Sequence, residues 1–185
     1  MYLHKAECYV HPIMTFLQKL SAYTIGFFTD KDLPDIAMSG LEEGYDSESL
    51  RILAGLNSAE NLFVLDGYLI KALKELRLKL KERKEALISV ISFYANNVVD
   101  KKADPYIEFE RINEIINKTE FDYIGIDLLP CYADYISIWE VETNGFPLQN
   151  GFLVYNGPEK KLFLDKTKDD MRKYLKEWLT IHGNT

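Results

Sequence analysis

The chain has 185 residues, of which 47% are hydrophobic and 28% are charged, and its formal net charge at pH 7 is −7. This composition is typical of a globular protein with a sizeable core, and it excludes an intrinsically disordered chain. The acidic balance disfavours general binding to nucleic acid, because phosphates repel a negative surface.

The first predicted helix covers residues 12–23, where Pro12 can occupy the first helical position. Its apolar side chains recur at helical spacing and fall on one face of the helix. These side chains are Ile13, Phe16, Leu17 and Leu20.

Two short helices, near residues 33–43 and 47–56, are predicted to form a hairpin around a Gly-Tyr-Asp turn. Pro34 suits the first turn of a helix, and Gly44 can adopt the left-handed conformation that ends one. Asp46 or Ser47 can cap the second helix. The agreement of these local signals is typical of a well-specified structural element.

Three longer helices follow, and Asp104-Pro105 supplies a cap and a first-turn proline for the last of them. They are predicted near residues 58–80, 85–99 and 105–118.

After residue 120 the pattern changes to short β-branched and aromatic runs, which predict strands. We expect a strand at residues 135–141, a hairpin made by residues 151–155 and 160–164, and a closing helix that begins at Thr167. The predicted fold class is therefore α+β, with a small antiparallel sheet confined to residues after about 130. Because no flexible linker is visible, residues 1–185 are predicted to form a single domain, with a helical subregion (1–120) and a second subregion (121–185).

Few residues could carry catalysis or hold a cofactor. No common hydrolase, zinc-protease, di-iron or nucleotide-binding motif occurs, so we expect no catalytic residues, metal or cofactor. His4, Cys8 and His11 come nearest to a metal-ligand set, but Pro12 favours a helix that leaves His11 outside it. Cys131 lies in an apolar stretch and is interpreted as a buried structural cysteine.

Cellular location is inferred from what the sequence lacks. Two cysteines are too few for a disulfide framework, which favours a reduced, cytoplasmic setting. The first twelve residues do not resemble a signal peptide, and no apolar run approaches the roughly 18 residues of a membrane span.

An acidic cluster surrounds the turn of the predicted hairpin. Glu42 and Glu43 end the first helix, where the helix dipole disfavours negative charge, so a functional contact is one explanation for them. Tyr45 is a large aromatic residue in the turn, and tyrosine is enriched among residues that dominate binding energy. With Asp46 and Glu48 these residues form the candidate binding site. The alternatives are a solvated acidic face and a Tyr45 side chain that folds back onto Leu41 and Leu50.

A basic cluster occupies residues 71–84, with seven bases and two acids. Such a cluster can bind nucleic acid, but it also suits the polar face and last turn of a long helix. We interpret it as structural because no aromatic residues are interleaved with the bases. The hairpin at residues 32–57 can be compared with a helix-turn-helix, but its acidic flanks disfavour sequence-specific DNA binding.

The segment LPDIAMSGLEEGYDSESLRILAGL resembles one found in uncharacterised bacterial proteins. The shared pattern joins Leu-Pro, a small-residue helix, Gly and Asp-Ser to Leu-Arg-x-Leu-Ala-Gly, and it covers about 24 residues from Leu33 onward. The resemblance implies a bacterial origin and brings no known activity.

The leading functional hypothesis is a cytoplasmic, non-enzymatic protein-binding domain, such as a toxin-neutralising immunity protein, because acidic faces can mask a basic surface. Its partner would be a protein with a basic surface, without membrane contact, and the oligomeric state is open. The alternative is an enzyme or small-ligand-binding protein with a Tyr/Trp-lined pocket between the helical part and the sheet.

Overall fold

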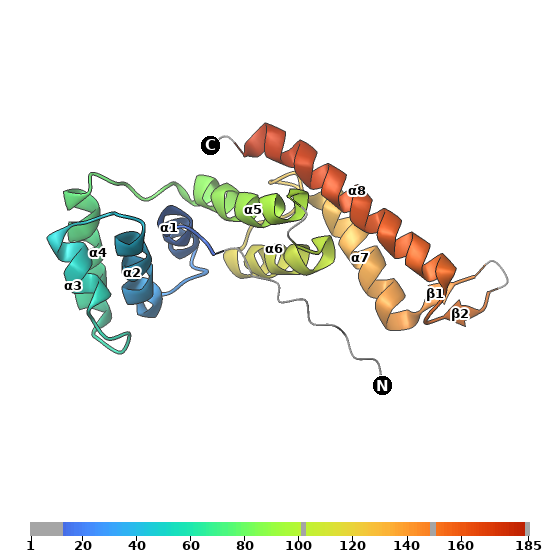
Figure 1. Ribbon diagram of the computed structural model, residues 1–185, viewed down its shortest axis with the longest axis horizontal. Helices are drawn as coiled ribbons and strands as arrows, with labels where there is room; N and C mark the ends of the chain where they lie inside the picture. The colour runs from blue at the N-terminus through green and yellow to red at the C-terminus, as the bar shows by residue number, and fades with distance from the viewer. Residues whose placement is uncertain (1–12, 101–102, 149–150, 184–185) are drawn as a thin grey trace. The chain divides into compact units, whose positions relative to one another are not determined.

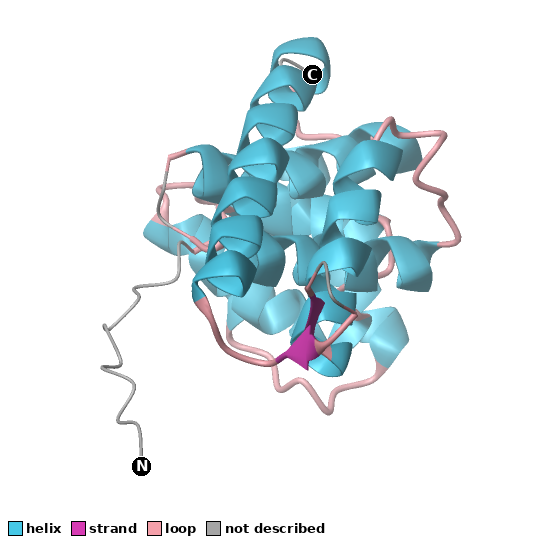
Figure 2. Ribbon diagram, turned by 90° about the vertical axis from the view of Figure 1, so that its right-hand side faces the viewer, coloured by secondary structure: helices cyan, strands magenta, loops and turns pink. Residues whose placement is uncertain are grey.

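The computed structural model describes residues 13–100, 103–148 and 151–183 (Figure 1). Within these residues nearly all regular structure is helical, and one pair of short antiparallel strands completes it (Figure 2). The mainly helical α+β class predicted from the sequence is therefore confirmed, as is a sheet confined to residues after about 130.

Contacts along the chain divide it into two compact units, and the division falls between Phe93 and Tyr94, inside helix α5 (Arg83–Val99). We call residues 13–93 the N-terminal unit and residues 94–183 the C-terminal unit. This division lies well before the change of pattern near residue 120. That the chain forms one cooperative domain stays a prediction.

The N-terminal unit contains α1 (Phe16–Thr24), a short 3-10 helix (Asp30–Asp32), α2 (Leu33–Glu42), α3 (Glu48–Ala54) and α4 (Leu62–Glu75). Helix α2 packs against α1 and α3, and α3 packs against α4. Their apolar faces share one core, formed by Phe16, Leu20, Leu33, Ile36, Ala37, Leu50, Leu53, Leu65, Leu69, Ala72 and Leu73.

The helix ends follow from local hydrogen bonds. Helix α1 begins after Thr15, which forms a capping box with Gln18, so it starts later than the predicted residue 12. Pro12 itself lies outside the described residues. Helix α4 begins after its Asn61 cap and stops at Glu75, because Arg77 takes a left-handed conformation (φ 57°). It is therefore shorter than the predicted 58–80.

Gly40 of α2 allows the Phe16 ring to lie directly on the helix backbone. A Cβ atom at this position would come within 3.0 Å of Phe16 Cδ2. At Gly67, in α4, an added Cβ would meet no heavy atom within 4 Å.

We therefore expect opposite results from two glycine-to-alanine changes. Gly40→Ala should lower the free energy of unfolding by about 1 kcal/mol, because crowding outweighs the gain in helix propensity. Gly67→Ala should raise it by about 0.5–1 kcal/mol. Urea denaturation followed by circular dichroism measures both, and a Gly40→Ala variant as stable as Gly67→Ala would refute the close contact with Phe16.

The C-terminal unit contains the end of α5, then α6 (Pro105–Thr119), α7 (Leu129–Asn144), β1 (Phe146–Pro147), β2 (Leu153–Val154) and α8 (Pro158–His182). Asp104 caps α6 as predicted, accepting hydrogen bonds from the backbone N–H groups of Tyr106 and Ile107. The strands pair Phe146 with Val154 and Pro147 with Leu153.

Two strand predictions are wrong. Residues 135–141 lie in α7, which begins with Pro130 in its first turn and buries a helical stripe formed by Cys131, Tyr135, Ile138 and Val141. Residues 160–164 lie in α8, so the partner of β2 is β1. Because α8 already begins at Pro158, Thr167 is not a cap, and its hydroxyl donates to the Phe163 carbonyl within the helix.

One stripe of α8 holds the segment that precedes α7. The Tyr174 hydroxyl donates to the Asp127 carbonyl (2.6 Å), and Trp178 Nε1 donates to the Ile126 carbonyl (2.7 Å). His182 lies one turn further along, with Nε2 3.3 Å from Asp127 Oδ2. These side chains, four residues apart, fix the segment on the helix.

Candidate functional site

The turn between α2 and α3 has a well-defined helix-ending geometry. Gly44 is left-handed (φ 90°), the Gly44 N–H donates to the Leu41 carbonyl, and the Tyr45 N–H donates to the Gly40 carbonyl. These two bonds form a Schellman motif, which satisfies carbonyls at the end of a helix. The glycine expected to end the helix does so, and the five candidate binding residues all lie on or beside this turn.

Glu43 caps a neighbouring helix. The backbone N–H of Phe16, the first residue of α1, donates to Glu43 Oε1 at 2.6 Å. A carboxylate at a helix N-terminus satisfies a free N–H group and interacts favourably with the dipole. The negative charge that is misplaced on α2 therefore stabilises α1.

Tyr45 is half-buried, and its ring packs on the core. The centroids of the Tyr45 and Phe16 rings are 4.9 Å apart, with an angle of 51° between their planes. Tilted aromatic pairs at this distance attract each other. The sequence did not suggest Phe16 of α1 as a partner of Tyr45. Leu41 also packs against this core.

Asp46 forms an exposed ion pair with Arg51 of α3. Arg51 Nε donates to Asp46 Oδ1 (2.6 Å) and Nη2 donates to Oδ2 (3.0 Å), a two-point contact. These hydrogen bonds hold the pKa of the Asp46 carboxyl below its usual range. Asp46 is therefore ionised at neutral pH, with its charge largely compensated.

Glu42 and Glu48 are exposed, and neither side chain has a hydrogen bond or ion pair among the described residues. Glu48 opens α3, where a negative charge suits the dipole, whereas Glu42 ends α2, where it does not. Neither carboxylate is held by a hydrogen bond within the described part of the chain, although that of Glu48 also attracts the Arg51 guanidinium.

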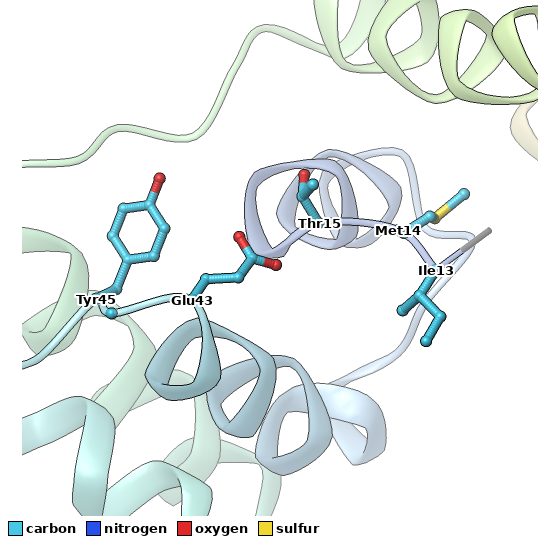
Figure 3. A pocket seen from close by; sticks show the side chains of 6 residues that line it. Ile13, Met14, Thr15, Glu43 and Tyr45 are labelled. Carbon is cyan, nitrogen blue, oxygen red and sulfur yellow. The ribbon is translucent and has the colours of Figure 1, made fainter.

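A hollow of ≈ 550 Å³ lies beside the turn, lined by Ile13, Met14, Thr15, Glu43, Gly44 and Tyr45. Figure 3 shows the Glu43 carboxylate directed toward the start of α1, with the Tyr45 ring beside it. The hollow therefore combines an apolar wall, a carboxylate and a phenol. The sequence could not indicate its residues 13–15, because only folding brings the start of α1 to the end of α2.

The described residues hold no group of three or more His, Cys, Asp or Glu side chains that could bind a metal ion. The candidate ligands His4, Cys8 and His11 lie outside the described residues. Cys131 is fully buried, and burial raises the pKa of its thiol well above the usual value, with the nearby Asp134 carboxylate adding to the effect. A protonated, buried thiol does not act as a nucleophile.

We accordingly expect Cys131 to resist alkylation in the folded protein. At pH 8 its reaction with iodoacetamide should be at least about a hundredfold slower than in the urea-unfolded chain, because the thiolate is scarce and shielded. Peptide mass spectrometry reports the modification of this cysteine separately from that of Cys8. Rapid labelling of Cys131 without denaturant would contradict its burial.

The basic cluster spans the end of α4, a connecting segment and the start of α5. Lys71 lies over the Tyr68 ring, 5.0 Å from its centroid, and both Lys71 and Lys74 are exposed.

Helix α3 would be the recognition helix if residues 32–57 formed a DNA-binding helix-turn-helix. It has only seven residues, and its Arg51 forms an ion pair with Asp46.

A second hollow, of ≈ 370 Å³, lies beside the small sheet. Its aromatic lining consists of Phe146 and Phe163, without the tyrosine or tryptophan expected for a ligand pocket there. Several tyrosines of the C-terminal unit instead stack on one another, including Tyr106 on Tyr135 and Tyr123 on Tyr132. The ligand-binding alternative therefore lacks its expected aromatic lining at this hollow.

Throughout the parts that the structure describes, no helix has the length and apolar character needed to cross a membrane. Comparisons with models of protein families, with curated proteins and with solved structures found no match. The chemistry of the turn is therefore the basis on which a function can be inferred.

Proposed function

We propose that this chain is a non-enzymatic protein-binding domain that uses the turn between α2 and α3 to engage a basic surface of a protein partner. A bacterial, cytoplasmic immunity protein that neutralises a toxin would work in this way. Glu42, Glu43, Tyr45, Asp46 and Glu48 form the proposed contact surface.

One observation supports this proposal above the others: the acidic side chains of the turn divide by structural role. Glu43 and Asp46 form hydrogen bonds with the Phe16 backbone and with Arg51, whereas Glu42 and Glu48 are exposed and make no hydrogen bond or ion pair among the described residues. Exposed carboxylates speed association with a basic partner and select against acidic ones.

The hollow beside the turn supplies the second component of an interface. Tyr45 is held by Phe16, so its ring would lose little conformational freedom on binding. Ile13, which is 80% exposed, adds apolar surface at the same hollow. A rigid aromatic anchor surrounded by charge is typical of the residues that dominate binding energy.

Site-specific photo-crosslinking tests this assignment. A photoreactive amino acid in place of Glu42 or Glu48 should capture one discrete protein from cells of the source organism, whereas the same amino acid at the exposed Glu177 of α8 should not. The captured protein should carry a basic surface at the crosslinked peptide. Equal capture from all three positions, or none from the turn, would refute the proposal.

A further inference from the structure

Helix α4 presents an apolar face to solvent, opposite the face that it buries. Leu65, Leu69 and Ala72 pack into the core. On the other side, Phe63 is 89% exposed and Ile70 is 59% exposed. They are seven residues apart, so they lie on the same side of the helix two turns from each other.

Gly67 lies between them on the same side of the helix. A glycine in the middle of a helix destabilises it relative to alanine, and here no neighbouring atom requires the absence of a side chain. The glycine leaves a notch between two exposed apolar side chains. Such a notch permits another helix to approach closely, toward the lower end of the roughly 8–10 Å axis separation of packed helices.

The charges around this face differ between its two ends. Glu60 is exposed just before the Asn61 cap, and Lys71 and Lys74 are exposed on the last turns of the helix. A second α4 lying antiparallel across Gly67 would bring Lys74 beside the start of the other helix. Glu60 precedes the Asn61 cap there, and its carboxylate accepts a hydrogen bond from the Asn61 N–H. The same register places Ile70 against Phe63 of the other copy, on one flank of Gly67, and the aliphatic stem of Lys71 against Val64 on the other flank.

We infer that the exposed face of α4 is a self-association surface, where two copies of this chain pair antiparallel about a two-fold axis at Gly67. The antiparallel arrangement also sets the positive end of each helix dipole beside the negative end of the other. A parallel arrangement would oppose like charges at both ends. This interface is separate from the acidic turn, and it stands whether or not the turn binds a partner.

Sedimentation velocity of the full chain tests the pairing between about 1 and 200 µM, a range that brackets the affinity expected of a small interface. Wild type should shift from monomer to dimer across this range. Gly67→Gln should weaken dimerisation at least tenfold by filling the notch, while its melting temperature at low concentration stays the same or rises by roughly 1–3 °C. This combination distinguishes a blocked interface from a damaged fold.

A charge exchange tests the antiparallel register. Lys74→Glu should weaken dimerisation because it faces Glu60 of the second copy, and adding Glu60→Lys should restore it. Lys79→Glu, the same charge change beyond the end of α4, is the matched control and should leave dimerisation unchanged.

Two results would overturn the inference. One is a wild-type chain that stays monomeric at every concentration, which would mean that another partner covers this face or that nothing does. The other is a dimer that persists unchanged in Gly67→Gln, which would place self-association elsewhere on the chain.

Discussion

Replacing Phe16 by alanine is expected to lower the free energy of unfolding of the N-terminal unit by about 3–5 kcal/mol. The side chain is 1% exposed, its ring lies against the backbone at Gly40, and it also packs on Tyr45. Its removal leaves a cavity at the junction of α1, α2 and the turn, which the rigid helices cannot fill. The measurement is urea denaturation followed by far-ultraviolet circular dichroism.

Leu17→Ala is the matched control for Phe16→Ala, since Leu17 is the next residue of α1 and is 43% exposed. Leu17→Ala should lower the free energy of unfolding by less than about 1 kcal/mol. A Phe16→Ala variant that loses no more than this control would show that the ring does not join α1 to α2 and the turn.

Replacing Trp178 by alanine is expected to lower the free energy of unfolding of the C-terminal unit by a similar amount, about 3–5 kcal/mol. Trp178 is 2% exposed, and its indole N–H donates to the Ile126 carbonyl. The variant therefore loses buried apolar area and leaves a buried carbonyl without its donor.

Trp178→Phe separates these two effects, because it keeps most of the ring and removes the N–H group. We expect Trp178→Phe to lower the free energy of unfolding by about 1–3 kcal/mol, the cost of leaving the Ile126 carbonyl without a hydrogen-bond donor. Trp139→Ala, at the 46% exposed tryptophan of α7, is the control and should lose less than about 1 kcal/mol. Equal losses for the two alanine variants would contradict the position of Trp178 on the segment before α7.

The Phe16 and Trp178 variants together test whether the chain is one cooperative domain. In a single cooperative unit, both substitutions shift the same unfolding transition. In two independent units, each substitution shifts the transition of its own unit and leaves the other unchanged.

The helices of the N-terminal unit can be predicted well from the sequence because their signals are local, and the same holds for the start of α6. The left-handed Gly44, the Ser47 cap and the Asp104-Pro105 start all appear as expected. Such signals depend on hydrogen bonds between residues a few positions apart, so the chain alone determines them.

The strand predicted at residues 135–141 is wrong because helical periodicity outweighs a local preference there. The β-branched and aromatic residues favour a strand in isolation, yet Cys131, Tyr135, Ile138 and Val141 have helical spacing and are all buried in α7. Pro130 occupies the first turn of α7, where proline is well tolerated. Burial of the stripe decides the outcome.

The roles within the acidic cluster could not be predicted, because they depend on contacts between distant residues. The Glu43 contact with the Phe16 backbone spans 27 residues, and the Tyr45 ring rests on that same residue. The sequence correctly marked the charge of Glu43 as misplaced on its own helix. Only the packing of α1 against α2 shows that Glu43 caps the N-terminus of α1.

The most direct test of the proposed function compares the affinity of the crosslinked partner for two double charge reversals. Glu42→Lys with Glu48→Lys leaves every hydrogen bond and ion pair described for the turn intact, although it removes the electrostatic attraction between Glu48 and Arg51. Glu110→Lys with Glu177→Lys is the matched control at exposed positions of α6 and α8. Measured by surface plasmon resonance at physiological salt, the turn variant should bind at least about tenfold more weakly, mainly through a slower association rate. The control variant should bind as wild type does. Unchanged binding by the turn variant would contradict the proposal that the turn between α2 and α3 engages a basic partner.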